Sequence, residues 1–148
     1  MPQAEASHPV RGASSEPSPA IAILAERLRS GTCHIGIYGL GYVGLPLALR
    51  FAEMGIRVTG FDIDSHKVDT LNSGNSYIER ITAADINQAR QANFTATTDF
   101  ALTAELAAQI ICVPTPLDQH HQPDLSFVID TVESICRTCA KVSCSRSA

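Results

Sequence analysis

Short apolar runs alternate with segments of helical periodicity along most of the chain. The runs predict strands over about residues 33–38, 56–62, 94–97 and 108–113, and the periodic segments predict helices over about 21–29, 42–54, 65–72, 82–91 and 99–106, with a last helix starting near Ser126. Strands that alternate with helices form right-handed crossovers and a parallel sheet. The strand over 108–113 is nearly all apolar, which predicts that both of its faces are covered. We therefore expect an α/β fold with a doubly wound parallel sheet.

Capping residues support the starts of two of these helices. Asp64 or Ser65 is expected to cap the first of them. Thr82, with Asp85 three residues further on, forms a variant of the capping box at the second. Both helices follow turns, so the sequence predicts where each begins.

The composition fits one soluble globular domain. The chain has 148 residues, of which 45% are hydrophobic and 18% charged, and its formal net charge is −4. This acidic balance has no basic footprint, so we expect no nucleic-acid partner. No apolar run reaches the roughly 18 residues that a membrane span needs, and the N-terminus has no signal-peptide pattern. We therefore expect a cytoplasmic protein without membrane contact.

Three segments of the chain differ in character. Residues 1–20 are rich in Pro, Ala, Ser and Glu and poor in large apolar side chains, so we expect a disordered extension. Residues 21–135 carry the alternating elements and form the expected globular domain. Residues 136–148 hold three of the five cysteines, two of them as Cys136-x-x-Cys139. That pair resembles half of a zinc or redox site, but zinc needs two more well-placed ligands, so we expect no metal.

The most informative motif is a Gly-x-Gly-x-x-Gly pattern between an apolar run and a helical segment. Gly39 permits a sharp turn after the strand, and Gly41 lets phosphate oxygens approach the backbone. Gly44 lets the helix pack close to the strand, and Tyr42 and Val43 lie between the last two glycines. The first amides of such a helix and the positive end of its dipole face the anion. This pattern predicts a Rossmann-type βα turn that holds a pyrophosphate.

An acidic residue stands where a dinucleotide site needs one. Asp62 ends the second expected strand, 18 residues after Gly44, which is near the spacing for the carboxylate that binds the adenosine ribose. A carboxylate there favours NAD, because it repels a 2′-phosphate. Lys67 has two interpretations, a group near the adenosine end or a solvated helix lysine. The alternative for the whole region is a buried glycine turn without a ligand, with Asp62 as a strand-end cap.

A third segment follows the last expected strand directly. It reads Val113-Pro114-Thr115-Pro116, and its two prolines make a stiff turn. In doubly wound sheets, ligands lie beyond the carboxyl ends of the strands, so this segment and the glycine turn are expected to meet there. The Thr115 hydroxyl would then lie near a nicotinamide ring and orient a water or a substrate hydroxyl. A rigid loop without a chemical role is the alternative.

These residues resemble a known family. Segments 39–48, 60–68 and 112–117 look like the N-terminal domain of the UDP-glucose/GDP-mannose dehydrogenases. Segments 76–81 and 123–128 look most like its UDP-N-acetylglucosamine 6-dehydrogenase branch. The resemblance implies oxidation of a sugar C6 alcohol to a carboxylate by two NAD⁺, with a cysteine that traps the aldehyde. It also implies that full-length relatives bind a UDP-sugar and form homo-oligomers.

The resemblance assigns roles to individual positions. By position, the residues that hold NAD would be Gly39, Gly41, Tyr42, Val43, Gly44, Asp62, Lys67, Val113, Pro114 and Thr115. The glycine turn would hold the pyrophosphate and Asp62 the ribose, with Lys67 nearby. Thr115 would help position the catalytic water.

The chain also departs from the family pattern. The family's catalytic cysteine, its lysine and asparagine partners, its sugar-binding domain and a Glu-Ser-Thr-Thr stretch are absent, and none of the five cysteines lies in a matching motif. We therefore expect a truncated sheet, weak NAD binding and no turnover. The family pattern stops after Ile135, and codons for residues 136–143 read one base earlier can encode the family-like Leu-Pro-Tyr-Leu-Arg-Lys-Gly-Gln. This predicts a frameshift near residue 135.

Three functions remain open at this point. The first is a nucleotide-sugar oxidoreductase, with UDP-N-acetylglucosamine favoured and UDP-glucose, GDP-mannose and UDP-N-acetylmannosamine as alternative substrates. The second is an NAD-binding module without turnover. The third is an interaction protein that keeps the fold without a cofactor.

Overall fold

The structure is a computed structural model that describes residues 18–117 and 122–145. Its elements are α1 (Pro19–Arg29), β1 (His34–Tyr38), α2 (Gly44–Glu53), β2 (Arg57–Phe61), α3 (Ser65–Asn72), α4 (Ala83–Ala92), β3 (Phe94–Thr97), the 3₁₀ helix η1 (Phe100–Glu105), β4 (Ala108–Ile111) and α5 (Ser126–Ser145). The expectation of a disordered extension falls mostly on residues 1–17, which lie outside the described residues. Helix α1 begins at Pro19, two residues before the expected start.

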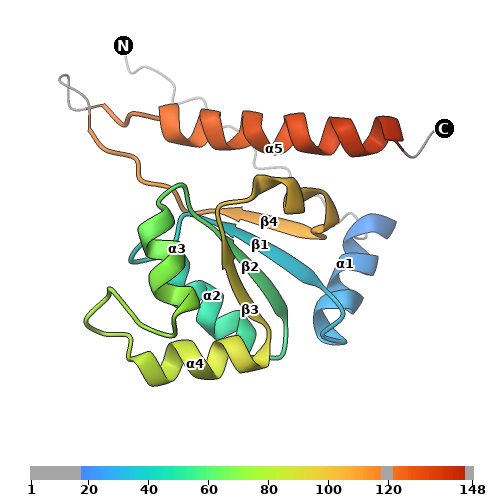
Figure 1. Cartoon of the computed structure of the whole chain (residues 1–148). Coiled ribbons are helices and arrows are strands. Elements are labelled where there is room, and N and C mark those ends of the chain that lie inside the picture. The colour runs from blue at the N-terminus through green and yellow to red at the C-terminus, as the bar shows by residue number, and fades with distance from the viewer. Residues whose placement is uncertain (1–17, 118–121, 146–148) are drawn as a thin grey trace, which may run out of the picture.

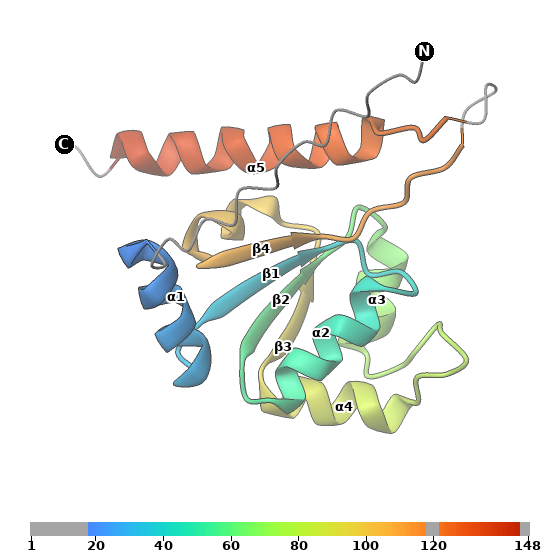
Figure 2. The same ribbon diagram turned by 180° about the vertical axis from the view of Figure 1, so that it is seen from behind.

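The four described strands form one parallel sheet in the order β3-β2-β1-β4. In register, Tyr38 of β1 pairs with Phe61 of β2 on one side and with Ile111 of β4 on the other. Helices α2, α3 and α4 cover one side of the sheet, whereas η1 and α5 lie on the other (Figures 1 and 2). This arrangement confirms the predicted doubly wound α/β fold of Rossmann type.

The core lies between the sheet and α2, α3 and α4. Ile35 and Ile37 of β1 are buried against Leu45 and Leu49 on the inner face of α2. The inward positions predicted for α3 are also buried, at Val68 and Leu71. Burial of aliphatic side chains on both partners stabilises this layer, at about 25 cal/mol per Å² of apolar surface removed from water.

The predicted caps of α3 and α4 are confirmed by hydrogen bonds. The Asp64 carboxylate accepts from the His66 amide at 3.0 Å and so caps α3. At α4 the Thr82 hydroxyl accepts from the Asp85 amide at 3.2 Å, and the Asp85 carboxylate accepts from the Thr82 amide at 2.8 Å. Each cap satisfies amides that have no partner within their own helix.

The expectation that the last strand is covered on both faces is only partly met. All four residues of β4 are half-buried, because β4 is the edge strand of the described sheet and pairs with β1 alone. The strand also ends at Ile111, two residues before the expected boundary. An apolar run indicates that a strand is buried, but it does not say which neighbour covers it.

Candidate functional site

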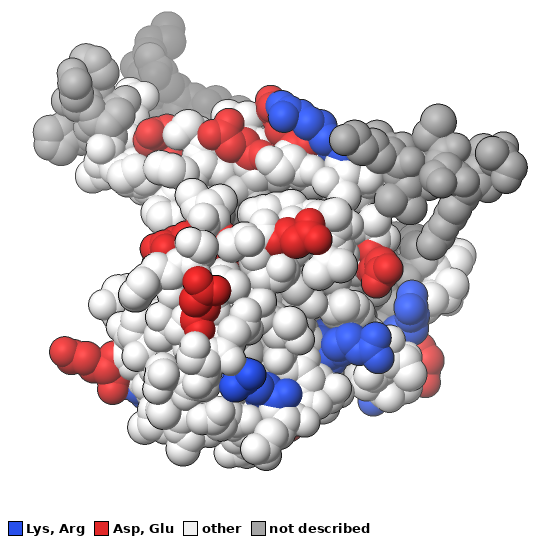
Figure 3. All heavy atoms as spheres, in the orientation of Figure 1, with Lys and Arg blue, Asp and Glu red and all other residues white. Residues whose placement is uncertain are grey.

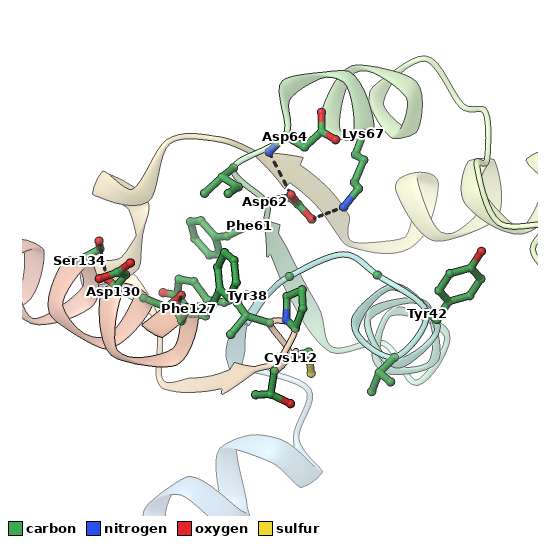
Figure 4. Close-up of a pocket in the computed structure, with 18 of the residues that line it drawn as sticks. Tyr38, Tyr42, Phe61, Asp62, Asp64, Lys67, Cys112, Phe127, Asp130 and Ser134 are labelled. Carbon is green, nitrogen blue, oxygen red and sulfur yellow. Dashed lines mark hydrogen bonds and ion pairs between the residues drawn. The ribbon is translucent and has the colours of Figure 1, made fainter. Parts of the chain in front are cut away.

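A cleft of about 1080 Å³ opens at the edge of the sheet where β1, β2 and β4 end. The predicted positions that line it are Gly39, Gly41, Tyr42, Val43, Asp62, Lys67, Val113, Pro114 and Thr115. The structure therefore brings the three predicted segments to one site, and Figure 4 shows them around the cleft. The remaining predicted position, Gly44, is buried behind the loop at the start of α2.

The three glycines of the loop have different environments. Gly39 adopts φ +92°, and a Cβ there would lie 2.7 Å from the Cys112 carbonyl oxygen. A Cβ at Gly44 would overlap with the Gly39 carbonyl oxygen, so close packing of α2 on the loop requires this glycine. A Cβ at Gly41 would meet no heavy atom within 4 Å. Packing of the protein therefore explains the first and third glycines, whereas Gly41 leaves open space.

The amino end of α2 has no side-chain cap, unlike those of α3 and α4. Its N-cap residue is Val43, which makes no side-chain hydrogen bond. Near this end, the Leu45 amide donates to the Gly41 carbonyl at 3.1 Å, and the Leu47 amide to the Val43 carbonyl at 3.2 Å. The amides of Gly41, Tyr42 and Val43 come before Leu45 in the chain and lie at the positive end of the helix dipole. This terminus has the geometry of an anion site.

Asp62 lies at the end of β2 with an exposed fraction of only 7%. Its carboxylate accepts from the Leu40 amide at 2.8 Å and from the Asp64 amide at 3.0 Å. The Lys67 ammonium lies 3.6 Å from the same carboxylate, as Figure 4 shows. A carboxylate has about four acceptor positions, so these three contacts leave about one for a ribose hydroxyl. They also fit the alternative of a strand-end cap, so they do not by themselves assign a ligand.

The segment after β4 lies directly beside the glycine loop. The Cys112 amide donates to the Tyr38 carbonyl at 2.7 Å, which continues the pairing of β4 with β1 past the end of β4. Pro114 and Thr115 follow with exposed side chains and line the cleft. Burial raises the pKa of the Cys112 thiol, so this cysteine remains protonated near neutral pH.

The cleft also contains residues that the sequence did not assign to it. Tyr38 and Phe61 stack with ring centroids 4.7 Å apart, and Phe100 of η1 packs against both. Helix α5 contributes the further lining residues Phe127, Asp130, Thr131 and Ser134. Tyr38 and Phe61 end their strands, so the sequence could have assigned these two aromatic residues to the cleft. No feature of the sequence predicted which face of α5 would approach the cleft.

Tyr77 is a further lining residue, from the segment between α3 and α4. Tyr77 and Glu79 both follow the turn at Gly74. The structure places Tyr77 in the lining, whereas Glu79 is exposed and not part of it. The Tyr77 hydroxyl donates a hydrogen bond to the Leu40 carbonyl in the glycine loop.

The charge distribution agrees with the acidic composition. On the face drawn in Figure 3, the acidic side chains of the described residues lie mostly in the upper and middle part, and most of the basic ones lie in the lower part. Among residues 18–117 and 122–145, no helix is both long and apolar enough to cross a bilayer.

Comparison with known proteins identifies the family. Residues 33–144 match the NAD binding domain of the UDP-glucose/GDP-mannose dehydrogenase family. The chain belongs to this family. The sequence-based recognition, which rested on the glycine loop, on Asp62 and on the segment after β4, is therefore confirmed.

Similar proteins include dehydrogenases of several nucleotide sugars. UDP-N-acetyl-D-mannosamine dehydrogenase of Escherichia coli K12 is 38% identical over 102 residues, which are 68% of this chain and 24% of that protein. UDP-N-acetyl-D-glucosamine 6-dehydrogenase of Pseudomonas aeruginosa is 37% identical over 101 residues, 68% of this chain and 23% of that protein. The chain thus spans about a quarter of the length of these family members.

Solved structures of family members have the same fold. A ternary complex of GDP-mannose dehydrogenase from Pseudomonas aeruginosa matches with a TM-score of 0.65 and 36% identity, covering 68% of this chain and 24% of that one. NDP-N-acetyl-D-galactosaminuronic acid dehydrogenase from Methanosarcina mazei Go1 matches with a TM-score of 0.68 and 29% identity, covering 83% of this chain and 28% of that one. NAD is the cofactor of the family domain that the chain matches.

Proposed function

We propose that the chain is the dinucleotide-binding part of an NAD-dependent nucleotide-sugar 6-dehydrogenase and that the cleft at the sheet edge binds NAD. One observation supports this most strongly: the uncapped amino end of α2 and the carboxylate of Asp62 face the same cleft. An anion and a ribose of one dinucleotide need these two groups at neighbouring strand ends. The residues present fit the cofactor, because Gly41 leaves its backbone accessible from the cleft.

Some loop residues would contact the pyrophosphate directly, and others would only keep the loop in place. The amides of Gly41, Tyr42 and Val43 would donate to its oxygens, since they lie ahead of Leu45 at the start of α2. Gly39 and Gly44 would act indirectly, by keeping the loop and the helix in close contact. Asp62 would accept from the adenosine ribose.

The segment after β4 would lie on the nicotinamide side. Bound NAD⁺ supplies a hydride acceptor for the C6 carbon of the sugar. Val113 and Pro114 would flank the ring, and the exposed Thr115 hydroxyl would orient a water or the substrate hydroxyl. The stiffness of the two prolines fixes where this hydroxyl lies relative to the loop.

Lys67 lies where it changes the charge of the ribose subsite. Its ammonium is 3.6 Å from Asp62, and its side chain is 36% exposed. Partial neutralisation of Asp62 would weaken its repulsion of a 2′-phosphate, so the preference for NAD over NADP depends on both residues. This ion pair favours the interpretation of Lys67 as a site residue over that of a solvated lysine.

We further propose UDP-N-acetylglucosamine as the sugar substrate of the whole protein. The support is the sequence of segments 76–81 and 123–128, and UDP-N-acetylmannosamine, UDP-glucose and GDP-mannose are the competing substrates. A UDP-N-acetyl-D-mannosamine dehydrogenase is 38% identical to the chain and a UDP-N-acetyl-D-glucosamine 6-dehydrogenase is 37% identical, so overall identity does not distinguish these two substrates. We also propose a homo-oligomeric state for the whole protein, in line with the resemblance, and a cytoplasmic location, in line with the composition.

An NAD-binding module without turnover is the second candidate for these 148 residues. Among the described residues that line the cleft, Cys112 is the one cysteine, and burial raises the pKa of its thiol. The thiolate that would attack an aldehyde is therefore disfavoured at this position. This observation favours cofactor binding over a complete oxidation by the cleft residues alone.

Two assays separate these proposals. Titration of the folded protein with NAD⁺, followed by heat and by thermal stability, tests cofactor binding, because a ligand specific to the folded state raises the stability. Absorbance of NADH at saturating UDP-N-acetylglucosamine, UDP-N-acetylmannosamine, UDP-glucose or GDP-mannose tests turnover. Binding without NADH formation supports the module, whereas sustained NADH formation refutes it. Folded protein without NAD⁺ binding refutes the dinucleotide site and leaves the interaction protein.

A further inference from the structure

Both backbone polar groups of Leu40 are bound by side chains from other segments. Leu40 stands between the first two glycines of the loop, and its amide donates to the Asp62 carboxylate at 2.8 Å. Its carbonyl accepts from the Tyr77 hydroxyl. The Leu40 side chain is fully buried and lies over Gly60, where a Cβ would come within 2.6 Å of it. The loop is thus held at one residue by three contacts, none of which comes from the loop itself.

The segment that carries Tyr77 is itself anchored. Gly74 adopts φ +80°, and its carbonyl accepts from the Asn87 side chain of α4 at 3.0 Å. The Ser76 hydroxyl accepts from the Ile78 amide at 3.1 Å, and the Ile78 side chain is 6% exposed in the core. The tyrosine is therefore fixed on both sides along the chain, so its hydroxyl has a defined position over the loop.

We infer that Tyr77 is a positioning residue for the dinucleotide site: it holds the glycine loop through the Leu40 carbonyl, so that the loop amides are presented to the cofactor before it binds. This inference rests on the proposed NAD site and adds to it a residue outside the glycine motif. A loop that is ordered in the free protein loses less entropy on binding, so its affinity is higher. The Tyr77 ring also lines the cleft beside Asp62, on the ribose side of the loop.

The hydroxyl of Tyr77 stays a donor under working conditions. Burial, together with the negative charges of Asp62 and Asp64, raises its pKa well above the ordinary value for tyrosine. The phenol is therefore neutral at physiological pH and has one proton to donate. The Leu40 carbonyl accepts this hydrogen bond, so the bond persists as long as the phenol stays protonated.

The test compares Tyr77→Phe with a matched control, Thr59→Val. The first variant removes only the hydroxyl that reaches Leu40. The second removes a hydroxyl that bonds to His34 at 2.8 Å at the opposite, amino-terminal end of β1, and its side chain has the same shape as threonine. Both lose one side-chain hydrogen bond, so a general loss of stability affects both.

Three quantities are measured: Kd for NAD⁺, thermal stability, and hydrogen exchange in the free protein of the Gly39 and Leu40 amides, which donate to the Phe61 carbonyl and the Asp62 carboxylate. We expect Tyr77→Phe to weaken NAD⁺ binding and to speed exchange at these amides by about fivefold each, the loss of one neutral hydrogen bond. For Thr59→Val we expect Kd and loop exchange within about twofold of the parent.

Each other outcome has a distinct meaning. Parent-like Kd and exchange in Tyr77→Phe overturn the inference. Weaker binding with unchanged exchange also overturns it, because Tyr77 then acts by touching the cofactor rather than through Leu40. Equal losses in Thr59→Val show a global effect and overturn it as well. If the parent protein binds no NAD⁺, the proposed function fails, and the exchange comparison still decides whether Tyr77 holds the loop.

Discussion

Substitution of Gly41 by alanine separates the function of the glycine loop from its folding. In the structure a Cβ at this position meets no heavy atom within 4 Å, and its φ lies outside the left-handed region. The folded state therefore accepts the methyl group, and the lower entropy of the unfolded chain raises stability by about 0.4–1 kcal/mol. For a chain of 148 residues this is a rise in Tm of roughly 1–4 °C.

The same methyl group occupies space that we assign to a phosphate oxygen. Its presence pushes the pyrophosphate away from the loop and costs at least one charge-assisted hydrogen bond, about 1.5–3 kcal/mol. We therefore expect Gly41→Ala to weaken NAD⁺ binding by about ten- to a hundredfold, measured by calorimetric titration alongside thermal melting. A variant that binds NAD⁺ like the parent would refute the assignment, and a Tm lowered by several degrees would show that Gly41 is needed for packing instead.

Three further predictions follow from particular contacts. Gly44→Ala is expected to destabilise the fold by about 2 kcal/mol or more, because its Cβ overlaps with the Gly39 backbone; a melting curve like that of the parent would contradict this. Asp62→Asn is expected to reduce the preference for NAD over NADP by about tenfold or more, measured as the ratio of the two Kd values. An unchanged ratio would show that Asp62 only holds the glycine loop through the Leu40 amide and does not contact the ribose. Burial and the positive charge of Arg57 lower the pKa of His34 in the folded protein. As the pH falls, the unfolded chain therefore binds a proton at this side chain near pH 6.5, before the folded protein does. The stability that His34 contributes is present above about pH 6.5 and decreases as the pH falls towards the lowered pKa of the folded state. His34→Gln should flatten this part of the pH profile in urea unfolding, and an unchanged profile would place the effect elsewhere.

Local signals in the sequence predicted most of the fold. Asp64 and the Thr82–Asp85 pair marked helix starts that the structure confirms, because these side chains act within a few residues of their own position. The glycine spacing, Asp62 and the two prolines after the last strand predicted the three segments that meet at the cleft. Each of these features depends on neighbours along the chain, which is why the sequence alone reveals it.

Features that depend on distant neighbours were not predicted. The partial exposure of β4 follows from its place at the edge of the described sheet, which an apolar run does not report. The approach of Phe127 and Asp130 to the cleft depends on how α5 is placed relative to the strand ends. The bond from Tyr77 to Leu40 joins positions 37 residues apart, and no spacing rule connects them.

The expected frameshift near residue 135 remains a prediction. In the structure, residues on both sides of this position belong to α5, and the family match extends to residue 144. The DNA sequence downstream of this point tests it directly. An open frame that encodes a Glu-Ser-Thr-Thr segment would support the frameshift, and the lack of one would refute it.

The most direct test of the central claim is an NMR titration of the ¹⁵N-labelled, folded chain with NAD⁺. We predict saturable shifts of the amides of Gly41, Tyr42 and Val43, together with Ile63 beside Asp62 and Thr115 after β4, and smaller shifts with NADP⁺. A well-dispersed spectrum in which these amides do not move, or in which the shifts gather away from the cleft, would contradict the account.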